Sequence, residues 1–454
     1  MGSAMVDLTN HEWVGDLDGM IQRRRIRVLV PYSKTSYFID KGVQRGVAYD
    51  MFKAFEDSLN LKRKTGNLRV HVAFIPTSRD ALAEALFSGK GDIVAGNITI
   101  TEERRKLADF TDPLTDSVKE VVVVAPGGPA IATLDDLAGQ SVHVRAGSIY
   151  ETNLKAVSDQ LTKAGKKAIN IKEVPANLED EDILEMANAS LIKVTVVDDH
   201  IAQFWKQIFP KLTVKDQVVV KNDLAVGWAM RKNSPLLKAE LDAFVKTHRQ
   251  GTAMGNQMLT KYLKSTKFVK SATSQAEIKK FQDLIALFRK YSDQYGVDWV
   301  LMAAQGYQES QLNQNAKSQV GAIGVMQVMP ETGKDMKVGD ITQVEPNINA
   351  GVKYIRFMID QFFKDEPMDD LNKALFTFAS YNAGPGRVKQ LRREAQQTGL
   401  NPNVWFNNVE RVASKRIGRE TVTYVSNIYK YYVAYTLSLE ELAERQKARP
   451  TSQQ

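Results

Sequence analysis

The sequence contains no cysteine and only five histidines among its 454 residues. The absence of cysteine excludes disulfide bonds and metal sites with thiolate ligands. All five histidines lie in the first 250 residues, so no imidazole is available in the second half of the chain. A serine–histidine–aspartate triad and a zinc site of the H-E-x-x-H type are therefore excluded there. We expect neither a metal nor a cofactor.

Long apolar runs are also absent. The longest, such as Val121–Pro126, have the length of a strand and are much shorter than the roughly 20 residues that a membrane-spanning helix requires. The N-terminus lacks the basic and then apolar segment that directs secretion. We interpret Met1–Met5 (Met-Gly-Ser-Ala-Met) as a cloning remnant and expect that a signal segment has been removed.

Length and charge set the broad class. A chain of 454 residues exceeds what one hydrophobic core usually serves, so two or three globular units are expected. Lys and Arg number 61 against 53 Asp and Glu, a formal net charge of +8. This surplus favours nucleic acid, an anionic lipid surface or a carboxylate-rich polymer as partner. On a chain of this length it is equally explained by solubility.

The first half of the chain alternates strand and helix patterns. Strand-like segments at Ile26–Pro31 and Val70–Pro76 flank a helical face formed by Met51, Phe55 and Leu59. This alternation predicts βαβ units with mostly parallel sheets, here an α/β module over residues 25–265 that follows an N-terminal tail over 1–24. The short polar stretch at 266–276 is the predicted linker.

The second half has the pattern of a mainly α domain over residues 277–440. Ile278, Phe281, Leu284, Ile285 and Phe288 form a stripe of helical period. Asp298 is the predicted N-cap of the next helix, near whose end Glu309 lies. A polar C-terminal tail is expected over 441–454.

Four clusters in this second half are chemically unusual. They are Gln308-Glu309-Ser310, Gly321-Ala-Ile-Gly-Val-Met-Gln-Val-Met-Pro330, Ser380-Tyr-Asn-Ala-Gly-Pro-Gly386 and Glu420-Thr-Val-Thr-Tyr-Val425. Tyrosine, asparagine and glutamine beside a carboxylate can stack on sugar rings and bond hydroxyl and N-acetyl groups. A single helical glutamate is usually a solvated surface residue, so the interpretation depends on all four clusters together.

In order and type these clusters resemble the lysozyme-like domain of the soluble-type lytic murein transglycosylases. That family carries Glu-Ser, then Gly-Leu-Met-Gln, then Ala-Tyr-Asn-Ala-Gly, then a late tyrosine in Glu-Thr-x-x-Tyr-Val. Here Val325 and Ser380 stand in place of the usual Leu and Ala. The resemblance implies an enzyme that cuts the glycan strands of peptidoglycan.

The resemblance also implies a mechanism with one carboxylate. Ordinary glycosidases use two, and after Glu309 the next acids are Glu331 and Asp335, beyond the glycine-rich cluster. The matched motifs contribute no obvious second carboxylate. Glu309 would protonate the bridging oxygen between N-acetylmuramic acid and N-acetylglucosamine and then accept a proton from the muramoyl C6 hydroxyl, which leaves a 1,6-anhydromuramoyl end.

By the same resemblance Tyr424 orients Glu309, while the glycan is bound by side chains from all four clusters. The implied substrate-binding residues are Ser310, Met326, Gln327, Tyr381, Asn382 and Tyr424. Structural interpretations stand beside these roles. Core packing would explain Tyr381 and Tyr424, a helix or turn cap would explain Gln327, and termination of the helix would explain Ser310.

The first half resembles the family-3 solute-binding proteins, which are periplasmic amino-acid receptors. The matching segments are Gly46-Val-Ala-Tyr-Asp50, Gly91–Arg104 and Asp109-Phe-Thr-Asp-Pro113. The resemblance implies an effector site in which Thr99 and Arg104 hold a ligand carboxylate, with Arg145 as a further basic residue and either Asp198 or Asp199 holding an ammonium group. The alternative is a degenerate module without a ligand, and Ile149, where the family has a small residue, agrees with it.

A solute-binding module followed by this catalytic domain is the layout of a family of membrane-bound lytic murein transglycosylases. The resemblance implies a periplasmic lyase, peripherally attached to the outer membrane of a Gram-negative bacterium, with peptidoglycan glycan strands as substrate and no nucleic acid partner. A peptide or amino acid derived from the wall is the expected effector. Two other functions stay open, namely a hydrolytic muramidase and a peptidoglycan-binding receptor without catalytic activity.

Overall fold

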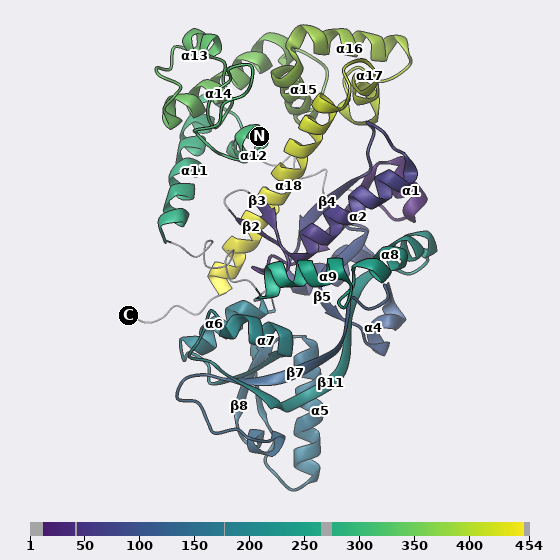
Figure 1. The fold of residues 1–454 in the computed structure, drawn as a ribbon, viewed down its shortest axis with the longest axis vertical. Coiled ribbons are helices and arrows are strands. Elements are labelled where there is room, and N and C mark those ends of the chain that lie inside the picture. The colour runs from purple at the N-terminus through teal and green to yellow at the C-terminus, as the bar shows by residue number, and fades with distance from the viewer. Residues whose placement is uncertain (1–11, 41–42, 177, 265–274, 449–454) are drawn as a thin grey trace.

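The computed structural model describes residues 12–40, 43–176, 178–264 and 275–448. Residues 266–274 of the predicted linker 266–276 lie outside this range. The described chain forms a module of two α/β lobes and a helical domain, which adjoins the first lobe at one end of the molecule (Figure 1). The predicted fold class, a two-lobed α/β module followed by a mainly α domain, is confirmed.

The first lobe contains the chain up to residue 114 and the segment that returns after residue 224. Its helices and strands are α1 (Leu17–Gln22), β1 (Arg25–Val30), β2 (Phe38–Asp40), β3 (Val43–Arg45), α2 (Val47–Arg63), β4 (His71–Pro76), η2 (Arg79–Ala81), α3 (Leu82–Phe87), β5 (Ile93–Thr99), α4 (Glu102–Leu107), β6 (Ala108–Phe110), α8 (Pro235–His248), α9 (Ala253–Leu259) and η4 (Thr260–Lys264). Its core is aromatic, with Phe52 packed on Trp228 at 4.2 Å between ring centroids.

The second lobe is built on the same alternation of strands and helices. Its elements are η3 (Leu134–Leu137), β8 (Ser141–Arg145), α5 (Ile149–Lys163), β9 (Asn170–Val174), α6 (Asp180–Asn188), β10 (Val194–Asp198) and α7 (Asp199–Lys206). Two long strands, β7 (Thr115–Val124) and β11 (Thr213–Arg231), join it to the first lobe.

The main sheet has the order β4-β1-β5-β11-β7-β10-β8-β9, with β6 also paired to β11. The pairs β1–β4, β1–β5, β8–β10 and β8–β9 are parallel, as the alternating pattern predicts. The prediction of mostly parallel sheets is wrong for the middle of the sheet, because β11 runs antiparallel to β5 and β7. A strand that returns from the second lobe to the first must run opposite to the one that left.

The helical domain packs around two central helices, α12 (Trp299–Ser310) and α18 (Arg419–Ala448). Its other helices are α11 (Gln275–Tyr295), α13 (Pro330–Met336), α14 (Val344–Met358), η5 (Ile359–Phe363), α15 (Asp370–Ala383), α16 (Pro385–Gln397), η6 (Trp405–Val409) and α17 (Glu410–Arg416). The predicted N-cap is confirmed, since the Asp298 carboxylate accepts from the backbone N–H of Val300 at 2.8 Å.

The helical domain contacts the first lobe through α18, which lies along β2 and β4 (Figure 1). At the edge of this seam Arg24 pairs with Glu410, and the Arg25 guanidinium lies over the rings of Phe406 and Tyr429. α18 therefore packs both within the helical domain and against the module.

Each of the two expected tails contains helical residues. α1 lies within the predicted tail 1–24, and α18 continues through Glu441 to Ala448. None of the described helices is long and apolar enough to cross a membrane.

Candidate functional site

Glu309 is placed by the last turn of α12. The helix has a wholly buried middle, Val300–Tyr307, so its end is fixed against the domain core. Immediately beyond it Gln311 and Leu312 both adopt left-handed backbone conformations, with φ of 55° and 60°. Two such residues in succession are uncommon outside glycine and end the helix abruptly. The carboxyl group of Glu309 thus projects from a rigid helix end.

A tyrosine from the far end of the chain meets this carboxyl group. The Tyr424 hydroxyl, on α18, donates a hydrogen bond to Glu309 Oε1. The Gln305 amide, one turn before Glu309 on α12, donates to the same tyrosine oxygen at 3.3 Å. Tyr424 is 6% exposed and Gln305 is fully buried, so both are held in one position. The sequence-based pairing of Glu309 with Tyr424 is therefore present in the structure.

The surroundings of Glu309 favour its protonated form. Burial raises the pKa of Glu309 to about 7, against the opposing effect of the hydrogen bond from Tyr424. Desolvation disfavours the carboxylate because few polar groups replace the lost water. A glutamate that keeps its proton near neutral pH can act as a general acid.

A hollow of about 530 Å³ opens in front of this pair. It is lined by Gln308, Glu309, Asn382, Glu420, Thr423 and Tyr424. Asn382 comes from the end of α15, and its side-chain oxygen accepts from the Thr421 hydroxyl at 2.6 Å. The hollow therefore brings together three of the sequence-predicted residues, Glu309, Asn382 and Tyr424.

Four other predicted residues lie beside the hollow rather than in its lining, and in this structure they fix the loop between α12 and α13. The Ser310 hydroxyl donates to the Val325 carbonyl at 2.9 Å, and the Tyr381 hydroxyl donates to the Met326 carbonyl at 2.7 Å. Gln327 turns back to the Gly324 carbonyl at 2.9 Å. Met326 is completely buried.

Sequence reasoning missed one support of this loop, Asn347. Asn347, on α14 and fully buried, accepts from the Met326 N–H at 2.9 Å and donates to the Ile323 carbonyl at 2.8 Å. Gly324 has φ of 78°, and a Cβ there would lie 2.5 Å from Asn347. The glycine is thus required by the close approach of the asparagine. The four matched motifs did not include Asn347.

Glu420 is the second residue that sequence reasoning underused. It begins the last matched motif and lines the same hollow as Glu309, so a second carboxyl group is present in the cleft. Its side chain is exposed, whereas that of Glu309 is largely buried. The two acids therefore lie in different environments.

The module has a hollow of about 210 Å³ between its lobes. Thr99, Arg104 and Arg145 all line it, as the resemblance to solute-binding proteins implies. Arg104 donates to the Thr99 carbonyl at 2.7 Å, and among the described residues it contacts no carboxylate. Arg145 is paired with Asp180 at 2.9 Å. Arg104 is thus the cation in this hollow that an incoming carboxylate could pair with.

The two predicted ammonium-binding candidates differ in position. Asp198, at the end of β10, is 1% exposed and accepts from Asn97 of the first lobe at 2.7 Å. Burial raises the pKa of Asp198. Asp199 begins α7 and lines a different hollow, which also contains His200. Neither aspartate lines the hollow that holds Arg104.

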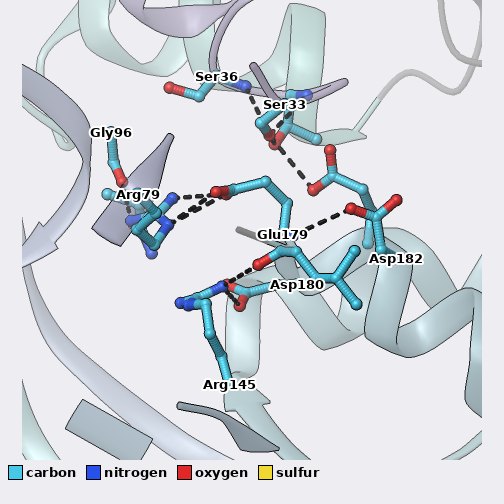
Figure 2. Close-up of polar contacts among 12 residues, drawn as sticks. Ser33, Ser36, Arg79, Gly96, Arg145, Glu179, Asp180 and Asp182 are labelled. Carbon is cyan, nitrogen blue, oxygen red and sulfur yellow. Dashed lines mark hydrogen bonds and ion pairs between the residues drawn. The ribbon is translucent and has the colours of Figure 1, made fainter. Parts of the chain in front are cut away.

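The lobes are joined across the cleft by an ion pair and a hydrogen bond that sequence reasoning missed. Arg79 of the first lobe forms two bonds with the Glu179 carboxylate of the second, at 3.0 and 2.7 Å, and a third with the Gly96 carbonyl (Figure 2). The neighbouring Glu181 accepts from the Lys34 N–H at 2.8 Å. The acidic run Glu179–Asp182 at the start of α6 was the available signal.

Comparison with known families agrees with both halves of this geometry. Residues 25–265 match the bacterial extracellular solute-binding proteins of family 3, and residues 286–403 match the transglycosylase SLT domain. The fold and the site thus define a peptidoglycan lytic transglycosylase, a lyase, fused to a solute-binding module.

Relatives share the whole layout. A membrane-bound lytic murein transglycosylase F of Desulfosudis oleivorans is 30% identical over 436 residues, which cover 90% of each chain. That of Aeromonas salmonicida is 29% identical over 439 residues, covering 92% of this chain and 83% of the relative. The chain belongs to the membrane-bound lytic murein transglycosylase F family.

Because the pKa of Glu309 is raised, we predict that the free energy of unfolding is lower at high pH than at low pH. In the unfolded chain a glutamate ionises near pH 4.3, whereas the folded protein holds this proton to about pH 7. Stability is therefore lost as pH rises between these values. Glu309→Gln should remove this loss and stabilise the protein by up to about 3.5 kcal/mol at pH 8, with little gain at pH 4.

Urea unfolding at both pH values measures this difference. Glu331→Gln on α13, whose side chain is exposed, is the matched control. A gain of equal size at pH 4 and pH 8 would contradict the prediction.

Proposed function

We propose that the protein cleaves the bond between N-acetylmuramic acid and N-acetylglucosamine and leaves a 1,6-anhydromuramoyl end, with Glu309 as both acid and base. The observation that carries this proposal is the Tyr424–Glu309 hydrogen bond at the wall of the hollow, on a carboxyl group whose pKa is raised to about 7. Peptidoglycan as the substrate follows from the family to which the chain belongs.

The proposed reaction runs in two steps. Glu309 first donates its proton to the bridging oxygen, so that the C1–O bond breaks while the substrate's own N-acetyl group stabilises the cationic centre. The resulting carboxylate then takes the proton of the muramoyl C6 hydroxyl, whose oxygen bonds to C1. Atoms balance without water, because the proton that is given in the first step is recovered in the second.

The neighbouring side chains have distinct proposed roles. Tyr424 keeps one Glu309 oxygen occupied, so that the other is directed toward the substrate. Asn382 lines the hollow and has an amide N–H₂ group that can donate to a sugar carbonyl or hydroxyl. Ser310, Met326, Gln327 and Tyr381 would act on the substrate through the loop that they anchor.

A hydrolytic muramidase is the second candidate, because Glu420 places another carboxyl group in the hollow. In hydrolysis such a group serves as nucleophile or as the base that activates water. The Glu420 side chain is exposed rather than buried. This favours the lytic reaction, because that reaction does not need a second carboxyl group.

Digestion of purified sacculi followed by mass spectrometry of the soluble products distinguishes the two reactions. The lytic product is lighter by one water than the hydrolytic one. Glu309→Gln should lower the rate by several orders of magnitude, since general acid–base catalysis and its transferable proton are lost. Glu420→Gln should release the same anhydro products at no less than about a tenth of the wild-type rate. Hydrated products, or a Glu420→Gln variant as inactive as Glu309→Gln, would instead support hydrolysis.

Tyr424→Phe should shift the pH profile. The hydrogen bond from Tyr424 lowers the Glu309 pKa, so its removal should raise that pKa further. Activity requires the protonated acid, and the decline of kcat/KM on the alkaline side should therefore move from about pH 7 to higher pH, while kcat falls because the carboxyl group is less well oriented. A lower rate with an unchanged alkaline limb would show a packing role only.

We also propose that the module binds a wall-derived peptide or amino acid and regulates the enzyme. Thr99 and Arg104 would hold its free carboxylate, in competition with the closed arrangement maintained by Arg79 and Glu179. A route to the active site exists, because β4 of the first lobe packs on α18, which carries Tyr424. A coupling of about 1–3 kcal/mol is typical of such pairs of sites.

Calorimetric titration with wall peptides, followed by sacculus digestion with and without them, tests this regulation. Arg104→Ala should abolish peptide binding and any activation but leave basal cleavage intact. Arg105→Ala, the exposed neighbour on α4, is the matched control and should bind normally. Absence of binding, or binding without a change in rate, would leave the module as a scaffold.

For the location of the protein we propose the periplasm, with peripheral attachment to the outer membrane. The related proteins are named membrane-bound, and the net charge of +8 suits an anionic surface.

A further inference from the structure

A second large hollow, of about 610 Å³, lies at the seam between the first lobe and the helical domain, away from the residues of both sites described above. Trp13, Arg23 and Arg24 line it from the module, and Asn407 and Arg411 line it from the segment η6–α17. No lining residue that the structure describes is acidic. The hollow is therefore a cationic site made by two domains.

Two carboxylates pair with the arginines that line this hollow. Asp92, the partner of Arg23, also pairs with Arg27 and Arg231. Glu410 is fully buried and pairs with Arg24. Guanidinium groups around the hollow thus outnumber the carboxylates that neutralise them.

Arg411 adds a further positive charge to this surplus of guanidinium groups. Its side chain is exposed on α17, and among the described residues no carboxylate lies within ion-pair distance of it. Burial lowers the pKa of Arg23 to about 10, with further lowering by Arg27 and Arg25 against the opposing charge of Asp92. A cation shifted in this direction gains when an anion approaches it.

The backbone holds these side chains in an arrangement that has a conformational cost. Arg24 follows the end of α1 and has a left-handed φ of 53°, at a position where glycine is the usual residue. Arginine there supplies a guanidinium that reaches Glu410 and, at 3.1 Å, the Asn407 oxygen. The Arg23 guanidinium carbon lies over the Trp13 ring, at 3.7 Å from the ring centroid. The guanidinium groups are therefore pre-positioned by rigid elements.

We propose that this hollow binds a phosphate group, with Arg23, Arg24 and Arg411 as its ligands. A phosphate monoester carries nearly two charges and three strong acceptor oxygens, whereas a carboxylate brings one charge. Arginine forks match its oxygens in pairs. Because the ligands come from both domains, an occupant would hold the module against the catalytic domain at this edge. The phosphate could belong to a soluble molecule or to an anionic lipid headgroup.

The test uses the complete chain at low ionic strength. Pyrophosphate is the soluble probe in calorimetry, succinate is its carboxylate counterpart, and vesicles of phosphatidylcholine with or without phosphatidic acid, whose headgroup is a phosphate monoester, are the lipid probe. Arg411→Gln should weaken pyrophosphate binding by about tenfold through the loss of one charge-assisted contact. Arg416→Gln, on the same helix but paired with Glu394 outside the hollow, is the matched control and should bind as the wild type does.

Each outcome decides the proposal or the source of the phosphate. Arg411-dependent binding of pyrophosphate without binding to vesicles assigns the site to a soluble phosphate. Arg411-dependent binding to phosphatidic acid vesicles assigns it to a lipid headgroup. The proposal is overturned if neither probe binds, if Arg411→Gln and Arg416→Gln weaken binding equally, or if succinate binds as tightly as pyrophosphate. Thermal unfolding of each variant establishes that it is folded.

Discussion

The hydrogen bond between Tyr424 and Glu309 joins the two helices on which the catalytic domain is built. It links the C-terminal end of α12 to α18, and it lies where burial has raised the pKa of the carboxyl group. The Glu309 carboxyl group therefore needs this hydrogen bond, but it cannot accept many more without losing its raised pKa. Without the tyrosine the acid would lose its orientation, and with more hydrogen-bond donors its pKa would fall and the proton would be lost near neutral pH.

α18 also explains how two otherwise separate functions can influence each other. Along its length the helix contacts Glu309 through Tyr424 and the first lobe through β2 and β4. The lobes themselves are held by bonds such as Arg79–Glu179, whose partners are largely withdrawn from water. Breaking one partner of a buried pair is costly unless a ligand group replaces it. The carboxylate-bearing ligand proposed for the module would meet that condition, and the closed arrangement would then open in response to it.

The sequence was sufficient to predict features that are local or periodic. The strand and helix alternation, the Asp298 cap and the position of Glu309 at a helix end all arise from residues a few positions apart. The pairing of Glu309 with Tyr424 spans 115 residues and was reached only through resemblance to a family. This pairing was thus predictable because both residues belong to motifs of a known family.

Contacts without a motif were not predictable. Arg79 and Glu179 are 100 residues apart, and the acidic run that contains Glu179 does not indicate which basic residue it pairs with. The antiparallel course of β11 depends on its return from the second lobe, and Asn347 supports the active-site loop from a helix outside the matched clusters. Each of these contacts depends on where a distant segment of the chain lies, and composition and periodicity do not predict that position.

The distribution of charge follows from these constraints as well. In the module Glu179 is neutralised by Arg79 of the opposite lobe and Asp180 by Arg145 of its own lobe, whereas at the seam with the catalytic domain arginines predominate. Like charges at a seam repel and weaken the association of the domains unless an anion intervenes. The aromatic contacts of Arg23 and Arg25 reduce this repulsion only in part, because a ring face attracts a cation more weakly than a carboxylate does. The strength of the seam should therefore depend on the anions around it, while the interlobe contacts, which contain their own counter-charges, should depend on them much less.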